Sequence, residues 1–109
     1  MKDLVVGLDI GTSSIKLVVL NINNNEIYLE FRESTEKARI ICNPSFDEQN
    51  VDMILELVNN TLVQIPDSCY DRLKGVQVCG QMHGIVLWNT VTKKHSNLIT
   101  WQGKYLFYK

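Results

Sequence analysis

The first third of the chain alternates apolar runs with short polar segments. Residues 4–8, 15–20 and 27–31 are apolar runs that are rich in β-branched or aromatic side chains. Glycine, threonine and serine separate the first two runs, and three asparagines, residues 23–25, separate the second from the third. β-Branched runs between such segments are typical of strands, and asparagine tolerates the left-handed backbone conformation of tight turns. The pattern therefore predicts a three-stranded antiparallel meander.

The spacing of apolar residues changes after residue 50. Apolar side chains now recur every three or four positions, at Val51, Ile54, Leu55, Val58, Leu62 and Ile65. This spacing predicts an amphipathic helix whose apolar stripe packs against the core. Asp47 or Asn50 can cap its start, and Pro66 prevents its continuation. The mixed, polar segment before it, residues 34–49, is predicted to be mostly loop.

Three further strands are predicted in the second half of the chain. Residues 75–79, 84–88 and 98–101 are apolar runs, and residues 89–97 form a polar turn. The predicted order is β-β-β-α-β-β-β, without an internal repeat. That order is typical of an α/β domain in which a mixed sheet packs against a helix.

Composition narrows the class of protein. A chain of 109 residues holds one domain at most, and 45% apolar with 21% charged residues is ordinary globular composition. The net charge is −1 and the lysines and arginines are scattered, which argues against a nucleic-acid partner. The apolar stretch over residues 4–20 is interrupted by Asp9 and Lys16 and is too short to span a membrane.

The cysteines indicate the compartment. Without CxxC spacing or a signal peptide, they are interpreted as reduced, buried thiols of a cytoplasmic protein; they are Cys42, Cys69 and Cys79.

The segment between the first two predicted strands, GLDIGTSSIK at residues 7–16, carries candidate chemistry. A tight glycine turn can direct backbone N–H groups at a phosphate, and a lysine adds a positive charge. A carboxylate would repel phosphate, so it would face Mg²⁺ or its waters. The alternative is a plain hairpin turn, since the segment is neither a Walker A loop nor GxGxxG. The candidate residues for phosphate are Asp9, Gly11, Thr12, Ser13, Ser14 and Lys16, with Asp9 also the candidate for magnesium.

The same segment resembles a known phosphate motif. Residues 6–16, VGLDIGTSSIK, are similar to the first phosphate motif of the superfamily of sugar kinases, hexokinase, actin and Hsp70. This resemblance implies an α/β fold of the ribonuclease-H-like, actin/hexokinase type, with a βββαβ core and a mixed sheet in the N-terminal lobe. It also implies that ATP, with Mg²⁺, is bound between two lobes.

A second motif narrows the resemblance. Gln81 and His83, by their chemistry, could hydrogen-bond a polyol, although a single histidine is more often structural. GQMHG at residues 80–84 resembles the substrate loop of the FGGY carbohydrate kinases, and LITWQ at residues 98–102 resembles their next element. The resemblance implies that the sugar contacts are Gln81, Met82, His83 and Trp101.

The resemblance also implies a reaction. FGGY kinases transfer a phosphoryl group from ATP to a sugar hydroxyl. GQMHG, LITWQ and the segment of residues 48–51, together with the lack of an Arg-Pro pattern, favour the ketose sedoheptulose over xylulose. The resemblance covers residues 3–102.

The last residues depart from the family pattern, which continues with Asp-x-Arg and a much longer chain. We therefore expect residues 1–102 to be part of an FGGY N-terminal domain and residues 103–109 to be a non-family tail. Because GKY at residues 103–105 can be encoded by codons that contain a consensus intron start, read-through of an intron is a hypothesis for that tail.

No catalytic residue is assigned, because the aspartate that acts as general base in the family is expected outside this chain. The chain alone is therefore expected to be inactive. Two alternatives remain: a truncated, non-catalytic binding module, or another ATPase of the actin and hexokinase superfamily, against which GQMHG argues.

Overall fold

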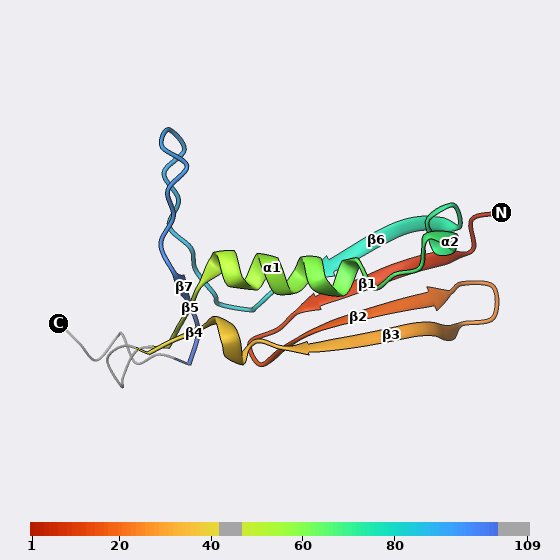
Figure 1. Ribbon diagram of the computed structural model, residues 1–109, viewed down its shortest axis with the longest axis horizontal. Helices are drawn as coiled ribbons and strands as arrows, with labels where there is room; N and C mark the ends of the chain where they lie inside the picture. Colours follow the sequence, from red (N-terminus) through yellow and green to blue (C-terminus); the bar gives the residue numbers. More distant parts are fainter. Residues whose placement is uncertain (42–46, 103–109) are drawn as a thin grey trace.

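A mixed β-sheet forms the body of the computed structural model, which describes residues 1–41 and 47–102 (Figure 1). Within this part of the chain, the sheet has four strands in the order β3-β2-β1-β6. The strands are β1 (Leu4–Ile10), β2 (Ser14–Asn21), β3 (Glu26–Ser34) and β6 (Leu73–Cys79). β1, β2 and β3 are antiparallel neighbours, and β6 lies parallel to β1. The predicted meander and the mixed sheet are confirmed.

One face of the sheet packs against the helix α1 (Val51–Leu62). Alternate residues of the central strands point to this face, and they are buried together with Ile54 and Leu57 of the helix. Of the two candidate caps, Asn50 is the N-cap, because its side chain accepts the N–H of Met53 at 2.9 Å. The strand residues of this core are Leu4, Val6, Leu8, Ile15, Leu17 and Val19.

The helix ends earlier than the sequence pattern predicts. α1 stops at Leu62, and a short second helix, α2 (Asp67–Tyr70), begins just after Pro66. Proline fits this position because its fixed φ and missing N–H suit the beginning of a helix. Ile65 still reaches the core from the connecting turn, with an exposed fraction of 4%.

The segment predicted to be a loop contains regular structure. A 3₁₀ turn, η1 (Glu36–Ala38), precedes the short strands β4 (Arg39–Ile40) and β5 (Glu48–Gln49). β5 also pairs with β7 (Leu98–Ile99), which gives a second, small sheet in the order β4-β5-β7. Pairings this short depend on partners far away in the sequence, so local periodicity could not reveal them.

The prediction of a strand over residues 84–88 is wrong. These residues form single antiparallel bridges, Ile85 with Ile99 and Trp88 with His95, in a twisted ribbon that stands away from the sheet (Figure 1). Among residues 1–41 and 47–102, the ribbon pairs with its own returning chain and with no other segment, and its apolar side chains are exposed, Leu87 and Trp88 at 66% each. A β-branched or aromatic run needs a neighbouring strand and a covered face to become a regular strand.

His95 ties this ribbon to α1. Its Nε2 lies 3.3 Å from a carboxylate oxygen of Asp52, and its Nδ1 lies 2.8 Å from the Ser96 carbonyl oxygen. The hydrogen bond to Ser96 is the largest cause that raises the pKa of His95, and the hydrogen bond to Asp52 raises it further.

The other face of the sheet is open. Val5, Val18, Leu20 and Gln77 help to line a hollow of about 450 Å³ on it. Cys69 is buried as predicted, but Cys79 at the end of β6 is exposed, so the prediction of a buried thiol is wrong there; Cys42 lies outside the described residues. Cys79 shares the open face with Gly7 and Asp9, and no described element covers that face.

The molecule is elongated. Its radius of gyration is 16.6 Å and its extents are 56 × 30 × 20 Å, whereas a compact chain of this length has a radius of gyration of about 13 Å. No helix within the described ranges combines the length and the apolar character that crossing a membrane requires.

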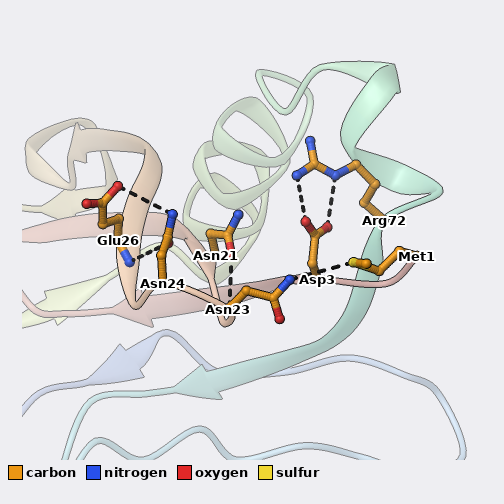
Figure 2. A network of polar contacts seen from close by, with 7 residues as sticks. All are labelled: Met1, Asp3, Asn21, Asn23, Asn24, Glu26 and Arg72. Carbon is orange, nitrogen blue, oxygen red and sulfur yellow. Dashed lines mark hydrogen bonds and ion pairs between the residues drawn. The ribbon is translucent and has the colours of Figure 1, made fainter.

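Polar contacts hold the end of the sheet opposite the glycine turn (Figure 2). Arg72 donates two hydrogen bonds to the Asp3 carboxylate, at 2.9 and 2.8 Å, and its guanidinium lies 5.3 Å from the Tyr28 ring centre. The hydrogen bonds from Arg72 lower the pKa of Asp3. This contact joins the starts of β1 and β6 to β3.

The asparagine turn between β2 and β3 has the predicted chemistry. The Asn21 and Asn24 side chains accept the backbone N–H groups of Asn23 and Glu26, at 2.9 and 3.0 Å. Asn25 adopts the left-handed conformation with φ 57°.

Candidate functional site

The two sequence motifs meet because β1 and β6 are parallel. Asp9 pairs with Cys79, so both strands end at the same edge of the sheet. The chain leaves β1 into the glycine turn at residues 11–13 and leaves β6 into GQMHG at residues 80–84. In sheets of this kind, ligands bind at the carboxyl ends of parallel strands.

The glycine turn is a tight hairpin connection. The Gly11 N–H donates to the Ser14 carbonyl at 3.0 Å, and a Cβ on Gly11 would lie only 2.9 Å from that oxygen. A larger residue would therefore force the turn open. The N–H groups of Thr12 and Ser13 make no hydrogen bond to any residue of the described ranges, and adjacent free N–H groups are suited to an anion.

Asp9 and Lys16 lie directly opposite each other on β1 and β2. Both side chains are exposed on the open face, where they line a hollow of about 330 Å³ with Gly7, Gln77 and Cys79. Asp9 Oδ1 lies 4.0 Å from the position that a Cβ on Gly11 would take, so the carboxylate is next to the turn.

The fit to magnesium depends on Asp9 alone. In the described part of the chain, no three histidine, cysteine, aspartate or glutamate side chains are close enough to hold a metal ion. One carboxylate fits Mg²⁺ well only when waters and phosphate oxygens supply the other ligands, which is the usual arrangement at nucleotide sites.

Gln81 turns inward from the second motif. Its Nε2 donates to the side-chain oxygen of Gln49 at 2.7 Å and lies 3.5 Å from the Gly11 carbonyl oxygen. Gln49 in turn donates from its own Nε2 to the Thr12 carbonyl at 2.8 Å. The Oε1 of Gln81 is buried and has no partner among the described residues.

The rest of GQMHG forms a tight turn. His83 takes the left-handed conformation with φ 63°, and a Cβ on Gly84 would lie 3.2 Å from a Leu98 methyl carbon and 3.3 Å from the Gln81 Cβ. The Met82 side chain is 75% exposed, and His83 is exposed as well. Both side chains are therefore free to meet a ligand.

Trp101 reaches the glycine turn from a third segment. Its indole N–H donates to the Thr12 hydroxyl at 3.3 Å, and 59% of the residue is exposed. Thr100 before it is buried, and its hydroxyl donates to Asp47 at 2.7 Å. Trp101 thus borders the turn with part of its ring open to solvent.

Thr12 receives hydrogen bonds from three residues outside the glycine turn. Its carbonyl accepts hydrogen bonds from Gln49 and Thr35, and its hydroxyl accepts one from Trp101. The structure brings Gly11, Thr12, Gln81 and Trp101 together, with Ser13 and Ser14 in the same turn. It places Asp9 and Lys16 beside them on the open face and leaves Met82 and His83 exposed on the second loop.

Two residues of this cluster were missed as site residues. Gln49 lies in the polar segment before the helix, and its isolated position there gives no chemical signal beyond the family resemblance of residues 48–51. Thr35 follows a predicted strand and has no signal in the sequence. Both are buried, with exposed fractions of 4% and 2%.

Comparison with known proteins identifies the family. Residues 4–105 match the N-terminal domain of the FGGY family of carbohydrate kinases. The chain belongs to this family, and the alternative of an actin-like or hexokinase-like ATPase is excluded.

Individual relatives agree with this assignment. The chain is 28% identical to mouse sedoheptulokinase, over 93% of this chain and 26% of that protein. It is 32% identical to xylulose kinase from Bacillus subtilis, over 89% of this chain and 19% of that protein. The chain therefore spans about a fifth to a quarter of the length of these relatives.

Solved structures confirm the fold. Xylulose kinase from Rhodospirillum rubrum superposes with a TM-score of 0.78 at 18% identity, over 92% of this chain and 21% of that one. Glycerol kinase from Plasmodium falciparum, solved with ADP, gives a TM-score of 0.77 at 17% identity, over 95% and 21%. The expected fold of the sugar-kinase N-terminal lobe is confirmed.

Proposed function

We propose that this chain supplies the phosphate-binding turn and part of the sugar-binding surface of an ATP-dependent ketose kinase. The observation that carries the proposal is that three segments meet beside Thr12 in a chain of the FGGY family, with Gln49 bridging Thr12 to Gln81. One of them is the glycine turn, and the other two are GQMHG and the segment that ends in Trp101.

The phosphates of ATP are assigned to the first of these elements. The free N–H groups of Thr12 and Ser13, the hydroxyls of the turn and the exposed Lys16 ammonium offer the donors that a polyphosphate requires. Mg²⁺ neutralises phosphate charge when bound. Asp9 would face it through water, because a direct approach of this carboxylate to phosphate is repulsive.

The sugar is assigned to the second loop and Trp101. A half-exposed indole offers an apolar surface for sugar carbons, and exposed Met82 and His83 lie on the loop that Gln81 anchors. We propose a ketose as substrate, with sedoheptulose preferred over xylulose. The sequence motifs and the similarity to sedoheptulokinases support this preference.

Phosphoryl transfer depends on positioning and on charge stabilisation around the transferred group. No side chain described in the structure is assigned as the base that activates the sugar hydroxyl. Because the chain spans about a quarter or less of its relatives, we expect the 109-residue polypeptide to bind ligands without turnover.

Titration with MgATP tests the phosphate assignment. We expect MgATP to shift the backbone amide resonances of residues 11–14, and Lys16→Met to weaken binding about tenfold, the effect of losing one charge-assisted contact. Lys74→Met is the matched control, since Lys74 is an exposed lysine near the start of β6, at the opposite end of the sheet. Equal weakening by both substitutions would contradict the assignment.

The same chain reports sugar binding through Trp101. In a Trp88→Phe background Trp101 is the remaining tryptophan, and its fluorescence should change at lower concentrations of sedoheptulose than of xylulose. The reverse order would contradict the preference, and an unchanged signal with both sugars would contradict the sugar assignment of Trp101.

A further inference from the structure

We propose that Gln49 is a positioning residue that fixes the glycine turn and the GQMHG loop relative to each other. The inference rests on the proposed function, because that function assigns phosphate to the first loop and sugar to the second. Gln49 touches neither ligand in this proposal. It acts through Thr12 and Gln81, and so sets the distance between the two bound groups.

Both polar atoms of the Gln49 side-chain amide form hydrogen bonds. Its Nε2 donates to the Thr12 carbonyl at 2.8 Å, and its Oε1 accepts from Gln81 Nε2 at 2.7 Å. The residue is 4% exposed, so water cannot readily replace either partner. A single amide thus connects the β1–β2 turn with the loop after β6 by two short hydrogen bonds.

The remaining contacts of Gln81 are weaker. Its distance of 3.5 Å to the Gly11 carbonyl is at the limit of a hydrogen bond, and its buried Oε1 has no partner in the described ranges. Gln49 is therefore the main polar anchor of Gln81. Without it, the GQMHG loop would lose its short connection to the glycine turn.

Thr35 offers a matched control inside the same cluster. Its hydroxyl donates to the same Thr12 carbonyl, and it is 2% exposed. It makes no described contact with Gln81. Thr35→Val keeps the shape of the side chain and removes a hydrogen bond from the glycine turn alone, whereas Gln49→Met removes a hydrogen bond from each loop.

The first experiment compares the ligand-free variants by their backbone amide resonances. We expect Gln49→Met to shift the resonances of residues 12–14 and 82–84, and Thr35→Val to shift those of residues 12–14 only. Unchanged resonances of residues 82–84 in Gln49→Met would overturn the proposal. Equal shifts of these residues in both variants would also overturn it.

The second experiment adds MgATP and separates this inference from the proposed function. In the unsubstituted chain MgATP should shift both sets of resonances, and in Gln49→Met only those of residues 11–14. If both sets respond in Gln49→Met as they do in the unsubstituted chain, the positioning role is overturned. If MgATP shifts neither set in the unsubstituted chain, the proposed function fails, and the ligand-free comparison decides the role of Gln49.

Gln49→Glu provides a further test if Gln49→Met does not fold. It keeps an acceptor for Gln81 but replaces the donor to Thr12 by a carboxylate oxygen. We expect the resonances of residues 12–14 to shift more than those of residues 82–84, and the shift to reverse at low pH, when the protonated carboxyl can donate again. A shift that does not depend on pH, or equal shifts in both loops, would overturn the proposal.

Discussion

At the scale of single residues, we expect the Asp3 carboxylate to stabilise the folded state through its ion pair with Arg72. The two hydrogen bonds from the guanidinium lower the pKa of Asp3, while its partial burial opposes this shift. The same contact raises the pKa of Arg72. A carboxyl whose pKa is lower in the folded state stabilises the fold above its unfolded pKa, and this contribution is lost as the pH falls through the folded pKa.

Asp3→Asn should therefore lower the melting temperature by a few degrees at pH 7. The difference from the unsubstituted chain should shrink as the pH falls below about 4, where the unfolded carboxyl takes up its proton. Thermal unfolding followed by circular dichroism from pH 7 to pH 3 measures this. Asp71→Asn, an exposed neighbour of Arg72, is the control; a difference between Asp3→Asn and the unsubstituted chain that does not change with pH would argue against the ion pair as its cause.

At the scale of elements, the start of α1 depends on Asn50. Its side chain satisfies the N–H of Met53, and its own N–H donates to the Ala38 carbonyl at 2.7 Å, so it joins the helix to the 3₁₀ turn η1. The helix carries much of the core through Ile54 and Leu57. Loss of the cap is therefore expected to lower the stability of the whole domain.

Asn50→Ala should lower the free energy of unfolding by about 1 kcal/mol, the usual cost of losing an N-cap side chain. Urea unfolding measures the change. Asn60→Ala is the matched control, since Asn60 is exposed within the same helix and alanine is the better helix former there. If the two substitutions cost the same, the cap does not contribute to stability.

At the scale of the whole molecule, we expect the uncovered part of the sheet to favour association between copies of the chain. Val76 and Val78 of β6 pair with Val6 and Leu8 and share their face of the sheet, yet they are 59% and 51% exposed. β6 is also an edge strand. Exposed apolar side chains on a free strand edge favour association between copies of a chain.

Replacement of both valines by lysine should shift the 109-residue chain toward the monomer. Sedimentation velocity measures the association, and circular dichroism checks that the fold is kept. Leu55→Lys, at an apolar position of α1 that is 58% exposed, is the control for added charge. Equal loss of association in the control would assign the effect to charge and not to β6.

The success of the sequence-based predictions depended on how local each feature is. The strands of the meander, the asparagine turn and the centre of α1 follow from residues close together in the chain, and all were predicted. The predicted strand over residues 84–88 does not form, because among the described residues this apolar run pairs with its own returning chain and has no covered face, which no local pattern reveals. Gln49 was missed for a related reason. An isolated glutamine does not indicate a functional site by itself, and its two hydrogen-bond partners, Thr12 and Gln81, are brought to it only by the tertiary structure.

The sequence by itself determined the family and its two motifs, because GLDIGTSSIK and GQMHG are short segments whose residue types define their chemistry. Only the tertiary structure decided that β6 lies parallel to β1, which brings both motifs to one edge of the sheet. It also decided that Gln81 turns inward to Gln49 and that Trp101 donates to Thr12. The physical reason is that hydrogen bonds between residues 32 to 89 positions apart are selected by the packing of the sheet, which no local pattern encodes.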